Sequence, residues 1–236
     1  MNKKNNKAVF LGVIPSRGGS KGIRKKGIKK VCGKPLIAYT IEHALSYKDI
    51  YKIIVTTDSS EIAKTAERYG AEVPFLRPKN LAKDNTPMLP VLKHALLNCE
   101  KLYSVKIKAI LLFDPTSPVR RQSDIKKMIE VFTKKNPDLL IAVSRCRRNP
   151  YFHLLKTNKN GFAEHVLKSK FIRRQDAPVV YDITNSCWIF SRRAILNCWR
   201  IPRKTLIHEI TSFYIDIDNK EDLDYFEYYI KSHNLK

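Results

Sequence analysis

The sequence has few acidic residues, few glycines and prolines, and no long apolar run. Asp and Glu total 22 against 45 Lys and Arg in 236 residues, which gives a formal net charge of +23 at pH 7. Only 8 Gly and 12 Pro accompany 43% hydrophobic residues, so collagen-like, low-complexity and disordered chains are excluded. No apolar stretch approaches the ~20 residues that span a bilayer. The length fits one large domain, or a domain with an insertion.

Cysteine is present without a pattern. The five cysteines include no C-x-x-C pair, which argues against a disulfide framework or a zinc site. We expect free thiols in a reducing compartment and therefore a cytoplasmic protein with no membrane association. The apolar run at residues 8–14 is short for a signal peptide, and SRGGSKG follows it in place of a cleavage site.

Apolar segments alternate between strand-like and helix-like spacing. The pattern predicts an α/β fold with a doubly wound, mostly parallel, Rossmann-like sheet. We expect strands at residues 8–14, 52–57, 72–75, 109–113, 139–143, 186–190 and 213–217. We expect helices at residues 35–46, 59–69, 90–102, 123–134, 192–197 and 220–232.

The alternation breaks in a basic stretch at residues 144–178. An N-x-x-G turn at residues 158–161 separates two segments that could pair as a hairpin. We therefore expect one α/β domain made of residues 1–143 and 179–236, with residues 144–178 as an insertion.

The loop after the first strand reads SRGGSKGIRKKGIKK and concentrates positive charge: residues 17–34 hold eight cations and no acid. In a doubly wound sheet this loop lies at the carboxyl edge, where ligands bind. Glycines allow close backbone approach, and cations and hydroxyls suit a polyphosphate. A solvated surface turn is the plain alternative. The predicted phosphate-binding residues are Arg17, Gly18, Gly19, Ser20 and Lys21.

Two acidic residues, Asp216 and Asp218, lie in the segment YIDID. If this segment is a strand, both carboxylates point to one side and can bind Mg²⁺. The alternative is an exposed edge, with Asp218 capping the next helix. Asp58, after the strand at 52–57, can likewise serve the site or cap a helix.

A weaker cluster comprises RRQDAP at residues 173–178, with Tyr181 and Asn185 after it. It could grip an anionic sugar or form a subunit contact, although a solvated turn is the default. The net charge also permits a rival function, a basic nucleic-acid-binding protein. However, the cations gather in one loop and no known nucleic-acid-binding motif is present.

Several motifs, taken together and in order, resemble the acylneuraminate cytidylyltransferases, also called CMP-sialic acid synthetases. The shared motifs cover nearly the whole chain: P-x-R-G-G-S-K-G at residues 15–22, G-K-P-L at 33–36, T-D-x-x-E-I-A at 57–63, L-R-P-x-x-L-A-x-D at 76–84, P-T-S-P-x-R at 115–120 and D-I-D-x-x-E-D-L at 216–223. The stretches RRNPYF at 147–152 and RRQDAP at 173–178 look like the bacterial branch that activates legionaminic acid. Asp114 also suits that branch.

The resemblance implies transfer of CMP from CTP to a 2-keto-3-deoxy nonulosonic acid, with release of pyrophosphate, for surface glycans. N-acetylneuraminate and pseudaminic acid are the alternative sugars. The family is typically a Mg²⁺-dependent homodimer, and residues 144–178 match its dimerisation segment. The implied roles are as follows: Arg17, Lys21, Asp216 and Asp218 catalytic; Arg17, Gly18, Gly19, Ser20, Lys21 and Arg77 nucleotide-binding; Asp216 and Asp218 metal-binding; Asp114, Arg174, Gln175, Tyr181 and Asn185 sugar-binding.

The sequence departs from the family pattern at four places. Gly27 stands where the family usually has Asn, and Arg24 stands in place of a Pro. Met88 replaces a small hydroxyl residue, and Asn185 is followed by Ser where Gly is usual. These departures bear on the nucleoside and sugar contacts more than on the reaction class.

Overall fold

A computed structural model describes residues 9–19, 23, 25–198 and 200–233. The chain divides into two compact units. The larger unit comprises Met1–Ala142 and Thr184–Lys236, and the smaller unit is Val143–Ile183. The predicted residues Ser20 and Lys21, and Arg24, lie outside the described residues.

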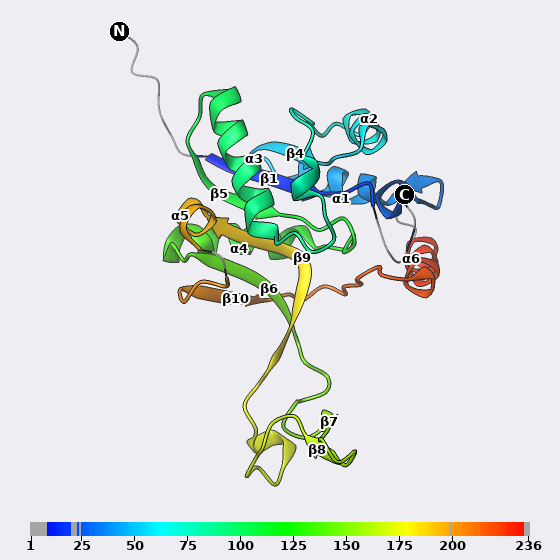
Figure 1. Cartoon of the computed structure of the whole chain (residues 1–236), viewed down its shortest axis with the longest axis vertical. Helices are drawn as coiled ribbons and strands as arrows, with labels where there is room; N and C mark the ends of the chain where they lie inside the picture. The colour runs from blue at the N-terminus through cyan, green and yellow to red at the C-terminus, as the bar shows by residue number, and fades with distance from the viewer. Residues whose placement is uncertain (1–8, 20–22, 24, 199, 234–236) are drawn as a thin grey trace. The chain divides into compact units, whose positions relative to one another are not determined.

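The larger unit is built on a six-stranded, mostly parallel sheet in the order β10-β6-β9-β5-β1-β4 (Figure 1). Strand β1 (Val9–Pro15) pairs in parallel with β4 (Ile50–Thr56) and with β5 (Ile107–Leu112). Strand β9 (Tyr181–Ser191) pairs antiparallel with β5. The remaining strands are β6 (Leu139–Arg145) and β10 (Thr205–Glu209). The α/β prediction is confirmed.

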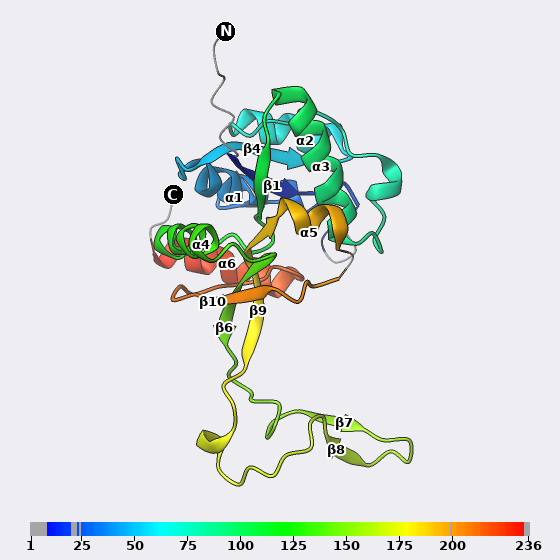
Figure 2. The ribbon, with the colours of Figure 1, turned by 90° about the vertical axis from the view of Figure 1, so that its left-hand side faces the viewer.

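Helices cover both faces of this sheet (Figure 2). One face buries apolar residues of α1 (Leu36–Leu45), α2 (Ser60–Arg68) and α4 (Gln122–Lys135) in a single core. On the other face α3 (Met88–Tyr103) and α5 (Arg192–Asn197) contact each other and β5. The last helix, α6 (Lys220–Ser232), forms a smaller core with β2 (Lys30–Val31) and the start of α1. Strand β2 pairs with β3 (Lys34–Pro35).

Two strand predictions are wrong. Residues 213–218 form no strand; one backbone bond, from Ile217 N–H to the Thr116 carbonyl (2.8 Å), ties them to the loop after β5. The edge strand lies earlier, at β10. Residues 72–75 contribute only an isolated bridge from Glu72 to Ile54.

The smaller unit contains the expected hairpin. Strand β7 (Leu155–Thr157) pairs antiparallel with β8 (Ala163–His165). The Asn158 side chain accepts hydrogen bonds from Asn160 N–H and Phe162 N–H at 3.0 and 3.1 Å, and Gly161 has a φ of 83°. These contacts close the turn, and the positive φ at its end favours glycine. A short helical turn, η3 (Arg174–Asp176), follows in this unit.

Candidate active site

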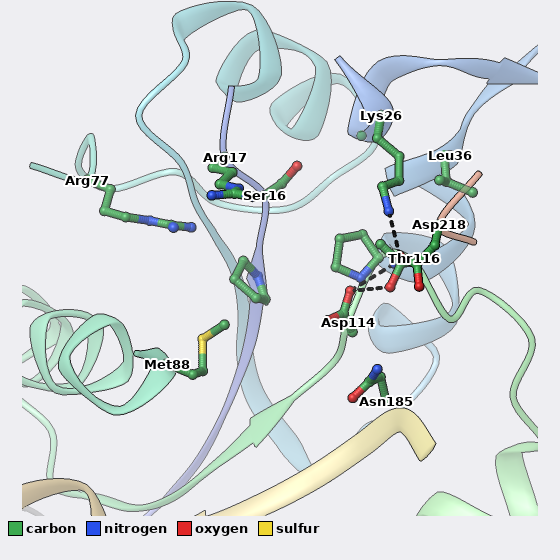
Figure 3. Close-up of a pocket in the computed structure, with 13 residues that line it drawn as sticks. Ser16, Arg17, Lys26, Leu36, Arg77, Met88, Asp114, Thr116, Asn185 and Asp218 are labelled. Carbon is green, nitrogen blue, oxygen red and sulfur yellow. Dashed lines mark hydrogen bonds and ion pairs between the residues drawn. The ribbon is translucent and has the colours of Figure 1, made fainter. Parts of the chain in front are cut away.

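A cavity of about 430 Å³ opens at the carboxyl edge of the central strands (Figure 3). Parallel β1, β4 and β5 all end at this edge, and antiparallel β9 brings an early residue to it. Ligands of open α/β sheets bind at such an edge. The cavity is lined by Pro15, Ser16, Arg17, Lys26, Gly27, Leu36, Arg77, Met88, Asp114, Pro115, Thr116, Asn185 and Asp218.

The loop after β1 is held against the start of α2. Gly18 N–H donates to the Asp58 carboxylate at 2.9 Å. A Cβ on Gly18 would lie 3.1 Å from the Ser59 Cβ, so glycine permits this close approach. Ser59, not Asp58, caps α2, since its hydroxyl accepts from Ile62 N–H. Asp58 therefore positions the loop and has no capping role.

One wall of the cavity is cationic. Arg77 is 6% exposed and donates from Nε to the Thr56 hydroxyl (3.2 Å) and from Nη2 to the Thr56 carbonyl. Burial lowers the pKa of Arg77 to about 10, against the opposing effect of Asp58, so the guanidinium stays charged at neutral pH. Arg17 is paired with Asp84. An anion entering this side meets two guanidinium groups.

Lys26, from the loop after β1, contacts the segment before α6 at the cavity. It lies in the short turn η1 (Lys26–Ile28) and donates to the Ile217 carbonyl at 2.6 Å. Its Nζ also pairs with Asp218 at 3.1 Å, and its side chain is only 16% exposed. The Asp218 side chain is 80% exposed. Lys26 was not among the predicted site residues, although its position in the basic loop was the available signal.

Asp114 forms the floor on the other side. One of its carboxylate oxygens accepts from Thr116 N–H and from the Thr116 hydroxyl, at 2.9 and 2.8 Å. Burial, with a smaller contribution from nearby Asp216, raises the pKa of Asp114. Below this loop the buried Arg120 donates to the Asp114 carbonyl and fixes the backbone.

Asp216 lies just outside the lining, and three donors hold its carboxylate. They are the Asn185 amide at 2.8 Å, the Ser117 hydroxyl, and the Thr116 hydroxyl at 3.3 Å, whose single proton is shared with the nearer Asp114 carboxylate. Asn185, predicted to bind the sugar, lines the cavity and also orients this carboxylate. The Thr116 and Ser117 hydroxyls were missed because nothing in a P-T-S-P string reveals their carboxylate partner.

Within the described residues, no three His, Cys, Asp or Glu side chains gather closely enough to hold a metal by themselves. Magnesium at nucleotide sites usually has one or two carboxylate ligands and completes its shell with water and substrate phosphates. Asp218, exposed on the cavity wall, fits that smaller requirement. Asp216 supplies a second, preoriented oxygen pair nearby in sequence.

The structure thus brings five predicted site residues to one cavity: Arg17, Arg77, Asp114, Asn185 and Asp218. Gly18 and Gly19 do not line the cavity, and a Cβ built on Gly19 would have no atom within 4 Å. Gln175 and Tyr181 belong to the smaller unit, as does the η3 turn that begins at Arg174. Their contacts with a sugar stay predictions. No helix in the described part of the chain has the length and apolar character to cross a membrane.

Known proteins resemble this chain in both sequence and fold. A CMP-N,N'-diacetyllegionaminic acid synthase of Campylobacter jejuni is 39% identical over 97% of this chain and 97% of its own. Post-translational flagellin modification protein B of Campylobacter coli is 37% identical over 96% and 97%. The structure of a CMP:2-keto-3-deoxy-manno-octonic acid synthetase complexed with CTP superposes with a TM-score of 0.73 at 13% identity, over 96% of this chain and 100% of that one.

The cytidylyltransferase family model matches residues 11–226. That match spans both ends of the cavity, from the loop after β1 to the acidic segment before α6. The chain therefore belongs to the cytidylyltransferase family.

Proposed function

We propose that this enzyme transfers CMP from CTP to a nonulosonic acid and releases pyrophosphate. The observation that carries the proposal is one cavity with a cationic wall, Arg17 and Arg77, opposite an acidic floor, Asp114 and Asp218. The guanidinium groups of the cationic wall suit a triphosphate. The carboxylates of the acidic floor suit a polyhydroxylated sugar and a metal ion. The anomeric hydroxyl oxygen bonds to the α-phosphorus and loses its proton to solvent. The bond from the α-phosphorus to the bridging oxygen breaks, and pyrophosphate leaves with that oxygen.

The nucleotide contacts follow from the loop after β1. We assign Arg17 and the Gly19 N–H to the phosphate oxygens, together with Ser20 and Lys21 of the same loop, while the Gly18 N–H is bonded to Asp58 and holds the loop in place. Lys21 neutralises charge on the departing pyrophosphate. Arg77 lies near the nucleoside. Support comes from the anchoring of Gly18 by Asp58, which preorganises the loop.

We assign Mg²⁺ to Asp218, with Asp216 as the second carboxylate. Both are oxygen donors, and the three hydrogen bonds to Asp216 orient its carboxylate before any ligand arrives. When bound, a magnesium ion neutralises phosphate charge and polarises the α-phosphoryl group. Lys26 holds compensating positive charge at Asp218 in the ligand-free protein.

We propose legionaminic acid, or a close relative, as the sugar. The 39% identity to a legionaminic acid synthase over nearly the whole chain supports this choice over N-acetylneuraminate and pseudaminic acid. We propose Asp114 and Asn185, which line the cavity, as sugar-binding residues. Arg174, Gln175 and Tyr181 are proposed for the same role from the family resemblance alone. The product serves surface glycan synthesis, and CTP as substrate places the reaction in the cytoplasm.

We also propose a homodimer formed through the segment Val143–Ile183. Large apolar side chains are exposed in it, among them Ile172 at 93%, Phe162 at 71% and Leu155 at 61%. Exposed apolar groups in such density mark an interaction surface. Sedimentation of the double variant Phe162→Asp, Ile172→Asp should give a monomer if the proposal is correct, and an unchanged dimer would refute this interface.

The reaction is tested by a pyrophosphate-release screen. CTP is offered with each of a panel of nonulosonic acids, and ATP, GTP and UTP serve as nucleotide controls. We expect release only with CTP, Mg²⁺ and a legionaminic-type acid. Release with another triphosphate and none with CTP would overturn the nucleotide assignment. A nucleic-acid-binding protein would instead bind single-stranded RNA tightly, with a steep salt dependence.

The residue roles are tested by substitution. Lys21→Ala and Asp218→Asn should each reduce turnover at least ~100-fold, because each removes a charge from the transition state. Asp224→Asn is the matched control, since Asp224 is exposed on α6. Wild-type turnover in both Lys21→Ala and Asp218→Asn would refute the assignments.

A further inference from the structure

Ser16 presents its hydroxyl to the cavity, and no residue in the described part of the chain bonds to it. The residue follows β1 directly, is 5% exposed, and its N–H bonds to the Thr56 carbonyl at 3.0 Å. The residue lines the cavity (Figure 3). The Ser16 Oγ itself is accessible from the cavity, so a ligand that enters the cavity can form a hydrogen bond with it.

Gly27 provides the space for this hydroxyl. A Cβ on Gly27 would lie 2.4 Å from the Ser16 Oγ but 3.7 Å from the Ser16 Cβ. The first distance is a clash and the second is ordinary van der Waals contact. The φ of Gly27 is not in the left-handed region, so its backbone accepts any residue. The Ser16 hydroxyl is the one group that a Cβ at position 27 would meet closely, so a side chain there, where the family usually has Asn, would force the hydroxyl into another position.

The position of Ser16 favours the nucleotide as its ligand. Ser16 is bonded to Thr56, which in turn accepts two hydrogen bonds from Arg77, and Arg17 is the next residue. The hydroxyl thus belongs to the cationic wall that attracts the polyanionic substrate. The acidic groups, Asp114 and Asp218, come from other loops.

We propose that the Ser16 hydroxyl, given room by Gly27, is a hydrogen-bonding contact to the bound nucleotide and determines its affinity. Ser16 and Gly27 act as one unit, in which a side chain at position 27 displaces the hydroxyl. The inference rests on the proposed function, because it takes CTP as the ligand.

A double-mutant cycle tests the proposal. The Kd for CTP is measured by calorimetry on the wild type, Ser16→Ala, Gly27→Ala and the double variant. Ser16→Ala should weaken binding about fivefold, since one neutral hydrogen bond contributes on the order of 1 kcal/mol and 1.4 kcal/mol is tenfold. Gly27→Ala should weaken it at least as much. The double variant should match Ser16→Ala alone, because alanine at both positions leaves no clash.

Other results would overturn the proposal. They are an unchanged Kd in Ser16→Ala, a rise confined to the KM for the sugar acid, or a double variant whose loss is the product of the single losses. Thermal melts of the four proteins test whether each is folded. If Gly27→Ala alone is unstable, the Kd of the folded double variant is compared with that of Ser16→Ala instead. Wild-type protein that releases pyrophosphate from CTP while the cycle fails would leave the proposed function intact. Wild-type protein that binds no CTP would refute both.

Discussion

Arg120 carries a positive charge into the interior, and its replacement by Met tests what holds the acidic floor of the cavity. The residue is 8% exposed. Its guanidinium donates to the Asp114 carbonyl, the Ser186 carbonyl and the Thr40 hydroxyl. These acceptors belong to three segments: the loop after β5, strand β9 and helix α1. Met has similar length and volume but no donor.

Two opposing effects set the expected loss of stability. A hydrogen bond to a charged group contributes about 2 kcal/mol, so three such bonds contribute roughly 6 kcal/mol. Burial lowers the pKa of Arg120 to about 10, which corresponds to about 3 kcal/mol against the charged form. Removing the guanidinium relieves that cost. The free energy of unfolding should therefore fall by about 3 kcal/mol, or about 6–12 °C in Tm for a chain of this size.

The assay is urea or thermal unfolding followed by circular dichroism. Arg121→Met is the matched control, because Arg121 is the next residue and is exposed, and it should change stability by less than ~0.5 kcal/mol. An Arg120→Met protein as stable as this control would refute the expected loss, because the desolvation cost of the guanidinium would then equal the contribution of its three hydrogen bonds.

Two further predictions concern groups beside the site. Burial lowers the pKa of His43 to about 4 in the folded protein. As the pH falls below ~6.5, the imidazole takes up a proton in the unfolded chain but not in the folded one. Stability is therefore lost as the pH falls from ~6.5 toward 4. Unfolding at pH 5 should require roughly 2 kcal/mol less than at pH 8, and His43→Gln should reduce that pH dependence; an identical profile would contradict it. Asp58→Ala should lower kcat/KM for CTP about 10- to 100-fold, because it removes the charged acceptor of the Gly18 N–H. Asp58→Asn keeps an acceptor, and its kcat/KM should lie between those of the wild type and Asp58→Ala. Equal kcat/KM in all three proteins would show that the loop needs no anchor.

The strands of the sheet interior were predictable because burial on both faces leaves a continuous apolar run. Strands β1 and β5 are almost wholly buried, and their sequences read that way. The edge strand β10 was missed because it is half exposed, with Ile207 51% exposed. Its sequence, TLIHE, differs little from that of a loop.

The segment before α6 shows the opposite error. Phe213 to Asp218 alternates apolar and polar residues, which is typical of a strand. Here the alternation has a different cause. Ile217 is buried in the small core with α6, whereas Asp216 turns to three side-chain donors and Asp218 meets Lys26. Tertiary contacts, not a sheet partner, select the pattern.

Motifs located the cavity but not the bonds within it. Arg17 was found because a basic, glycine-rich loop follows a strand end, whereas Arg77 and Asp114 were implied by the resemblance to a family. Asp218 was predicted from the alternation of a segment that is not a strand. Ser16 and Lys26 were not assigned. The role proposed for Ser16 depends on the missing side chain of Gly27, which leaves room for the Ser16 hydroxyl. The role of Lys26 depends on its hydrogen bond to a carbonyl 191 residues away in the sequence. Neither relation is local in sequence.

The contact between Lys26 and the Ile217–Asp218 segment has a consequence for biosynthesis. The ribosome delivers Lys26 to the growing chain 191 residues before its acceptor at Ile217. Until residues 216–230 emerge, Lys26 lacks its acceptors and the apolar side chains of Val31 and Leu36 lack Ile217, Leu223 and Phe226. A nascent or prematurely terminated chain can thus form most of the sheet and still lack an assembled site. Assembly of the cavity therefore waits for the segment that precedes and forms α6.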